Sequence, residues 1–144
     1  MVLSDSTVYN EVMLRYLSFT LIENNFWYFR NSPFGFEVIL GENHAIGVNT
    51  NIVQSVIGNN VRIGSNVYIE KSTIMSDVII MDNNIIINSI IGPKCTINAN
   101  CKLTSGCVLG PEIVLGQETV LGGAILELKE RRGNIFFINL TRVF

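Results

Sequence analysis

The fold is decided by residues 38–74, which read VILGENHAIGVNTNIVQSVIGNNVRIGSNVYIEKSTI. In this stretch a Leu or Ile recurs every six residues, apart from two steps of five. An α-helix has a period of about 3.6 residues and a β-strand a period of about two, so neither alone explains the spacing. A period near six is typical of the hexapeptide type of β-helix, in which short strands form the faces of a triangular coil. Fifteen residues, named the repeat residues here, continue the pattern to Leu121: Leu40, Ile46, Ile52, Ile57, Ile63, Ile69, Ile74, Ile80, Ile86, Ile91, Ile97, Leu103, Leu109, Leu115 and Leu121.

Two further positions follow the same period. The residue three after a repeat residue is often Asn or Gly, which tolerate positive φ and therefore fit a left-handed corner. These corner residues are Asn43, Asn49, Asn60, Asn66, Asn83, Asn100 and Gly106. The residue two before lies on the same inward side of its strand and is mostly small, so large and small residues alternate in a filled core. The small residues are Thr50, Ser55, Val61, Val67, Ser72, Val78, Ser89, Cys95, Cys101 and Cys107.

The shortened steps give a full coil of 17 residues, at which spacing Ser55, Ser72 and Ser89 recur. These serines are predicted to stack inside, with their hydroxyls bonded to the backbone. The later step from Leu103 to Leu109 takes six residues. We predict an all-β fold, a single-stranded left-handed parallel β-helix of about five coils over residues 38–123. The handedness comes from the repeat class, because ordinary parallel crossovers are right-handed.

The flanks lie outside the repeat. Ser4, Asp5 and Ser6 offer helix caps, and we predict a helix over about residues 6–17 within an N-terminal segment and cap spanning residues 1–37. The aromatic stretch from Phe19 to Phe36 is expected to plug the open first coil, whose strand edges need a cover. Residues 124–144 are predicted to form a hairpin from two β-prone runs, 124–129 and 134–140. Whether this hairpin packs on its own chain or on a partner is left open.

Composition excludes several classes of function. The chain has 144 residues, 48% of them apolar and 15% charged, and a net charge of −2. No apolar run approaches the ~20 residues of a membrane span, and no basic stripe suggests nucleic acid. The first residues do not resemble a signal peptide, and the odd number of cysteines predicts no disulfide framework. We therefore expect a cytoplasmic protein of one domain that contacts neither membrane nor nucleic acid.

No catalytic, cofactor-binding or metal-binding residue is predicted. Cys95, Cys101 and Cys107 could converge on the axis, but without zinc-like spacing they are better interpreted as small buried residues. His44 is the only histidine, and its place in the repeat points it into the first coil. Hexapeptide acyltransferases use a histidine as general base, but no long loop that could build their pocket is present. Asn84 takes an inward position and needs a partner for its amide.

The outward positions suggest a protein interface. Seven apolar residues, named the apolar belt here, flank the repeat residues, mostly around the third coil: Val56, Met75, Ile79, Met81, Ile85, Ile87 and Ile90. Down one face run Ile39, Val56, Thr73, Ile90 and Val108. A soluble monomer seldom exposes a contiguous apolar surface of this kind, so the belt is predicted to be a docking surface. Alternatively, the N-terminal helix or the C-terminal hairpin covers part of it.

The sequence also carries a family resemblance. The opening stretch, its continuations SIIGPKC (89–95) and TSGCVLGPEIVLGQETVL (104–121), and the upstream run from Arg15 to Phe26 resemble the carboxyl-terminal β-helix domain of the epsilon subunit of eukaryotic translation initiation factor 2B. The resemblance covers roughly residues 10–125. The repeat is shared with the gamma subunit and with sugar-nucleotide pyrophosphorylases, whereas the upstream run and the order of short and long corners favour epsilon.

This resemblance implies a non-catalytic scaffold module of the guanine-nucleotide exchange complex. Its expected partners are other subunits of that complex, a gamma-like subunit first, with initiation factor 2 contacted indirectly. The chain contains neither a nucleotidyltransferase-like domain nor the helical exchange domain, so we expect a fragment or a reduced homologue. The alternatives are a hexapeptide-repeat acyltransferase and the β-helix domain of a sugar-nucleotide pyrophosphorylase-like protein.

Overall fold

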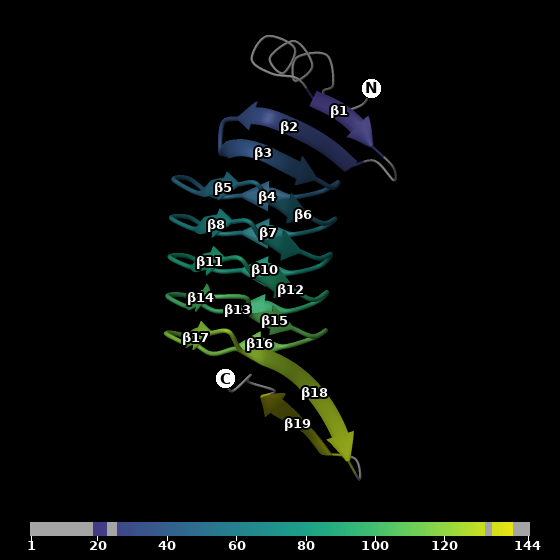
Figure 1. Cartoon of the computed structure of the whole chain (residues 1–144), viewed down its shortest axis with the longest axis vertical. Helices are drawn as coiled ribbons and strands as arrows, with labels where there is room; N and C mark the ends of the chain where they lie inside the picture. Colours follow the sequence, from purple (N-terminus) through teal and green to yellow (C-terminus); the bar gives the residue numbers. More distant parts are fainter. Residues whose placement is uncertain (1–18, 23–25, 132–133, 140–144) are drawn as a thin grey trace.

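The computed structural model describes residues 19–22, 26–131 and 134–139, with side chains described for residues 26–128. These residues form nineteen β-strands and no helix, so the described chain is all-β as predicted (Figure 1). The helix predicted over residues 6–17 lies outside the described residues. No helix in the described part of the chain is long and apolar enough to cross a membrane.

Most strands stack in parallel on three faces of a solenoid. Face A contains the end of β3 (Gly35–Leu40), β6 (Val56–Ile57), β9 (Thr73–Ile74), β12 (Ile90–Ile91), β15 (Val108–Leu109) and the start of β18 (Ile125–Arg131). Face B contains β4 (Ala45–Ile46), β7 (Arg62–Ile63), β10 (Ile79–Ile80), β13 (Thr96–Ile97) and β16 (Val114–Leu115). Face C contains the start of β3, β5 (Asn51–Val53), β8 (Tyr68–Glu70), β11 (Ile85–Ile87), β14 (Lys102–Thr104) and β17 (Val120–Gly122).

The strand register confirms the predicted coils. Ile57 pairs with Ile74, an offset of 17 residues, whereas Ile91 pairs with Leu109, an offset of 18. The extra residue lies in the corner before β15, where Ser105 and Gly106 both have positive φ, 61° and 84°. The earlier corners of this edge turn on one left-handed residue each: Glu37, Gln54, Lys71 and Asn88. The predicted longer corner is therefore confirmed, and its cause is a second left-handed residue.

The other two edges turn where the sequence predicts. Every predicted corner Asn has positive φ, between 55° and 65°. The same position is left-handed at Asp77, Lys94, Glu112 and Glu118, residue types that carry a conformational cost there. The backbone rather than the residue type thus sets these corners, because from the second coil onward the N–H of the corner residue bonds to the preceding coil, as Asn60 does to the Glu42 carbonyl at 2.9 Å.

The core is filled by the residues that the period selects. All repeat residues are buried except Ile46 in the first coil and Leu121 in the last, which are half-buried. All of the predicted small residues are buried between them. The serine column has its predicted hydrogen bonds: the hydroxyl of Ser72 donates to the Glu70 carbonyl at 2.8 Å and accepts the N–H of Ser89 at 3.0 Å. This ladder satisfies polar groups that would otherwise be costly inside an apolar prism.

The N-terminal end of the solenoid is capped by two antiparallel strands. β2 (Phe26–Ser32) pairs with β3 and places Trp27 opposite Leu40 and Phe29 opposite Val38. Both aromatic side chains are buried in the core, so this part of the predicted plug is confirmed. β1 (Phe19–Ile22) then pairs with β2 at the outer edge.

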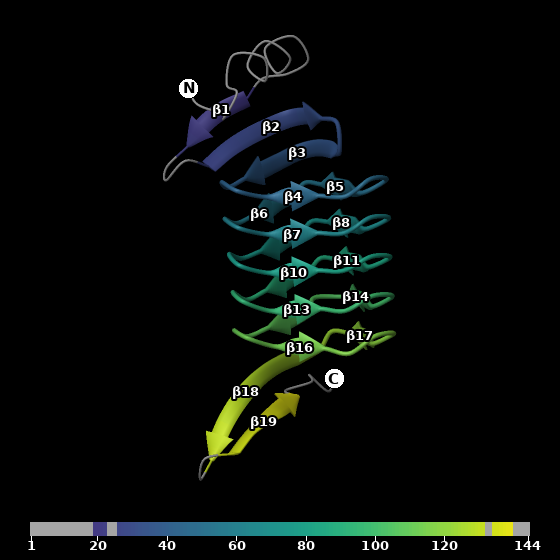
Figure 2. The ribbon, with the colours of Figure 1, turned by 180° about the vertical axis from the view of Figure 1, so that it is seen from behind.

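The C-terminal hairpin is confirmed by β18 and β19 (Asn134–Asn139). The first two residues of β18, Ile125 and Leu126, pair with β15 and continue face A into a sixth coil. The remainder of β18 leaves the solenoid and pairs only with β19, so that the two strands extend beyond the last coil (Figure 2). The hairpin is therefore attached to its own chain through face A.

A candidate protein-docking belt

The structure places the apolar belt on the outside of the solenoid. Five of its residues are exposed, each to between 37% and 42%: Met75, Ile79, Met81, Ile85 and Ile90. Val56 and Ile87 are half-buried. Each belt residue lies next to an inward repeat residue, because side chains alternate sides along a strand. The surface of the third coil is thus apolar while its interior is packed.

The belt is divided into pairs by the corners of the solenoid. Met75 follows face A and Ile79 begins face B, so they flank one corner. In the same way, Met81 and Ile85 flank the next corner, and Ile87 and Ile90 flank the third. Val56 lies apart, in the preceding coil on face A. The structure therefore groups six of the residues into three edge pairs at three successive corners.

On faces B and C, the neighbouring coils lack these apolar residues. At the corner of Met75 and Ile79, the second coil has Gly58 and Arg62 and the fourth has Gly92 and Thr96. Ile85 pairs with Lys102 of the next coil and with Tyr68 of the preceding coil. Ile79 and Ile85 thus have polar neighbours, as at the rim of a protein interface, whereas Ile90 stacks on the apolar Val108 of face A.

A buried amide supports one of the pairs. Asn84 is fully buried, and its Nδ2 donates to the Met81 carbonyl at 2.8 Å. Its Oδ1 accepts the N–H of Cys101 at 2.7 Å. The amide therefore has the hydrogen-bond partners expected from the sequence, and it connects the corner between Met81 and Ile85 to the next coil. A corner fixed in this way presents its apolar pair with little loss of conformational entropy on binding.

Face A carries the predicted outward column. The register stacks Ile39, Val56, Thr73, Ile90 and Val108 one above another. Beside this column, the position after the repeat residue is Gly in every coil except the third, where it is Met75. Face A is consequently a smooth surface of β-branched side chains from which one methionine projects.

Three ionisable side chains near the belt, those of Arg62, Tyr68 and Asp82, have hydrogen-bond partners. Arg62, which pairs with Ile79 from the preceding coil, donates to the Asn43 carbonyl at 3.1 Å. The hydroxyl of Tyr68 donates to the carboxylate of Glu70, and this hydrogen bond raises the pKa of Tyr68. Asp82 accepts the N–H of Ser65 at 2.9 Å. These groups stabilise the coil locally.

His44 is held inside the first coil as predicted. It is half-buried, and its Nδ1 lies 3.2 Å from the Gly41 carbonyl oxygen, which makes Nδ1 the protonated nitrogen. Burial lowers the pKa of His44; the hydrogen bond to Gly41 acts in the opposite direction, and the nearby charge of Arg62 lowers it again. The ring is therefore neutral at pH 7 and occupied by a structural contact.

This lowered pKa predicts a pH dependence. The unfolded chain binds a proton at His44 more readily than the folded chain, so stability falls as pH falls through the ordinary value of 6.5. In His44→Asn we expect the free energy of unfolding to decrease less between pH 7 and pH 5.5 than it does in the parent protein. Urea unfolding of both proteins at these two pH values measures the difference, and equal losses would refute the assigned environment.

The three cysteines are packing residues with thiol hydrogen bonds. Cys95 Sγ donates to the Gly110 carbonyl at 3.1 Å, and Cys101 Sγ to the Gly116 carbonyl at 3.1 Å. Cys107 Sγ donates to the Thr104 carbonyl at 3.2 Å. Burial raises the pKa of Cys95 and keeps it protonated. Across residues 26–128, no three His, Cys, Asp or Glu side chains are grouped so that they could hold a metal ion.

Two exposed residues of the last coil were not selected by the sequence analysis. Val114 on β16 is 53% exposed and Val120 on β17 is 71% exposed. Both occupy the same outward position as Ile79 and Ile85, one before a repeat residue. The rule that selected the belt could therefore have found them if it had been applied to the final coil.

The comparison with protein families agrees with this architecture. The family described as the EIF2B subunit epsilon LbH domain, where LbH denotes a left-handed β-helix, matches residues 20–121. The chain belongs to this family. The match begins in β1 and ends at Leu121, so it includes the capping strands and all five coils of the EIF2B epsilon-type β-helix. None of the curated proteins compared with the chain matches it.

Proposed function

We propose that the chain is a non-catalytic assembly module of the translation initiation factor 2B exchange complex. Membership of the epsilon-subunit family supports a role within a multi-subunit complex. The single observation that carries the proposal is the apolar belt, whose exposed pairs are confined to one coil. A gamma-like subunit is the first partner we propose, with initiation factor 2 contacted indirectly. The proposed setting is the cytoplasm, where the three buried cysteines would stay reduced.

The energetics suit a protein partner. Burying the exposed part of one belt side chain contributes about 1–2 kcal/mol at about 25 cal/mol per Å². A partner that covers two edge pairs therefore gains enough for measurable affinity after the cost of association. The interior offers no comparable surface, because the described core is filled by its own side chains.

The proposal predicts a selective loss of binding. Ile79→Lys places a charge in the edge pair of Met75 and Ile79. We expect it to lower the affinity for the partner subunit about tenfold or more, equivalent to about 1.4 kcal/mol. The measurement is co-purification of the full chain with each separately expressed subunit of the exchange complex. Ala45→Lys is the matched control, because Ala45 is exposed at the same position of face B in the first coil.

Several outcomes would contradict the proposal. Recovery of no subunit by the parent chain would remove the assembly role. Equal recovery with Ile79→Lys and Ala45→Lys would remove the belt from the interface. Nucleotide release from initiation factor 2 driven by this chain alone would replace a non-catalytic role with a catalytic one. A large loss of stability in Ile79→Lys would show that the chain's own termini cover the belt.

A further inference from the structure

The two ends of the solenoid differ. At the N-terminal end, β2 covers β3 and buries Trp27 and Phe29. At the C-terminal end, only face A continues, through the first residues of β18. On faces B and C the last strands are β16 and β17, and no strand of the described residues pairs with them on the far side. The last coil therefore leaves two open strand edges.

The hydrogen-bond pattern shows what these edges offer. On face B each coil donates to the next: the N–H of Gly47 to the Ile63 carbonyl at 2.8 Å, and so on through Gly64 and Met81. The last bond of this series joins the N–H of Asn98 to the Leu115 carbonyl at 3.2 Å. Gly116 occupies the next position, and a Cβ built there would meet nothing within 4 Å. The edge of β16 thus presents backbone groups in the register of a strand that the described chain does not supply.

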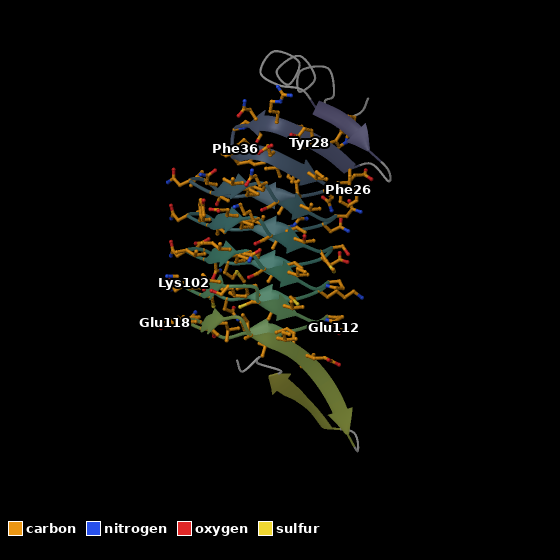
Figure 3. The ribbon with its side chains drawn as sticks, viewed as in Figure 1. Phe26, Tyr28, Phe36, Lys102, Glu112 and Glu118 are labelled. Carbon is orange, nitrogen blue, oxygen red and sulfur yellow. The ribbon has the colours of Figure 1, made fainter. Side chains whose placement is uncertain are left out.

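The side chains of β16 do not protect this edge. Proteins usually block an open edge with lysine, proline or a covering segment. Here Val114 is exposed, residues 103–128 contain no Lys or Arg, and their single proline, Pro111, lies in the corner before β16 and not in the strand. Glu112 and Glu118 flank β16 at its two corners, and their exposed side chains project at opposite sides of the last coil (Figure 3). An apolar strand edge with a carboxylate at each end fits an extended segment whose ends are basic.

We propose that the open edge of β16 binds an extended segment of a partner protein, which adds to face B as a sixth strand. Apolar residues at alternate positions of that segment lie beside β16, whose exposed apolar side chain is Val114. Lys or Arg on either side pairs with Glu112 and Glu118, and the N–H groups of Val114 and Gly116 gain partners. This site lies two coils from the apolar belt and does not depend on the proposed function. Strand addition to an exposed edge is an established mode of peptide recognition.

The test uses the full chain, labelled with nitrogen-15, and a synthetic peptide as the probe. The peptide is acetyl-Lys-Val-Thr-Val-Thr-Val-Arg-amide, and its control has proline in place of the central valine, because proline cannot donate to the ladder. We expect saturable shifts of the Val114 and Gly116 amide signals with the first peptide and none with the second. In Glu112→Gln with Glu118→Gln, the affinity should fall about threefold to tenfold, as expected for two exposed ion pairs.

Two substitutions of exposed valines separate the edge from the general surface. Val114→Lys should abolish the shifts, whereas Val48→Lys, at an exposed position of the first coil, should leave them unchanged. The assignment would be overturned by equal binding of the proline peptide, or by shifts confined to the belt. Slow amide exchange at Val114 and Gly116 in the free chain would overturn it in favour of an internal cover. A dimer in light scattering that Val114→Lys converts to monomer would overturn it in favour of a second copy.

Discussion

Ile80→Asp is expected to abolish folding. Ile80 is 1% exposed and stacks between Ile63 and Ile97 at the centre of face B. A carboxylate at this position is surrounded by apolar side chains and has no hydrogen-bond donor, which costs at least several kcal/mol. This penalty is comparable to the whole stability of a domain of this size, about 5–15 kcal/mol. Thermal unfolding followed by circular dichroism measures the effect.

The adjacent residue provides the control for this substitution. Ile79 is on the same strand but faces outward, 39% exposed. Ile79→Asp should therefore change the free energy of unfolding by less than about 1 kcal/mol, as surface substitutions usually do. An Ile80→Asp protein that melts like its parent would show that the assigned inward and outward faces are exchanged.

Gly47→Ala is expected to cost about 1–3 kcal/mol, the range of overpacking in a tight core. A Cβ on Gly47 would lie 2.6 Å from the carbonyl carbon of Gly64 and 2.7 Å from the N–H nitrogen of Ser65. These are backbone atoms of the next coil, and they cannot move away while the N–H of Gly47 stays bonded to the Ile63 carbonyl at 2.8 Å. Urea unfolding measures the loss.

Gly116→Ala is the matched control, because Gly116 has the same position on face B. Its Cβ would meet nothing within 4 Å, since no described strand lies beyond it. We expect no loss, and a gain of up to about 1 kcal/mol from the reduced freedom of the unfolded chain. Equal losses in the two variants would mean that glycine is needed at this position for its backbone conformation and not for the close approach of the coils.

The coils could be predicted from the sequence because each position of the repeat determines one local feature of the coil. The period fixes which side chain points inward, and the steps of five and six fix the length of each corner, so the register of Ile91 with Leu109 followed directly. The same logic identified the serine ladder. It did not identify the left-handed residues Gln54 and Lys71, because a shortened corner moves that conformation one place closer to the repeat residue.

The ends of the solenoid could not be predicted in the same way. Outside the repeat, pairing depends on contacts between segments that have no common period, such as Trp27 opposite Leu40. The continuation of face A into β18 likewise depends on which face the chain meets when the repeat stops. The open edge of β16 follows from that choice and from nothing local to β16.

The sequence predicted which residues form the candidate site but not how these residues are arranged around the coil. The sequence selected seven outward apolar positions, and five of them are exposed in the structure. Their division into pairs such as Met75 with Ile79 follows from the corners, which only the folded coil displays. Their role as an interface stays a prediction, since a docking surface is defined by its partner.

Whether the third coil carries the proposed subunit interface can be tested by amide hydrogen exchange of the full chain, alone and with a purified gamma-like subunit of the exchange complex. We expect slower exchange in the bound state at the corners of the third coil, over residues 75–79, 81–85 and 87–90. Unchanged exchange at these corners in a complex that demonstrably forms would contradict the proposed interface.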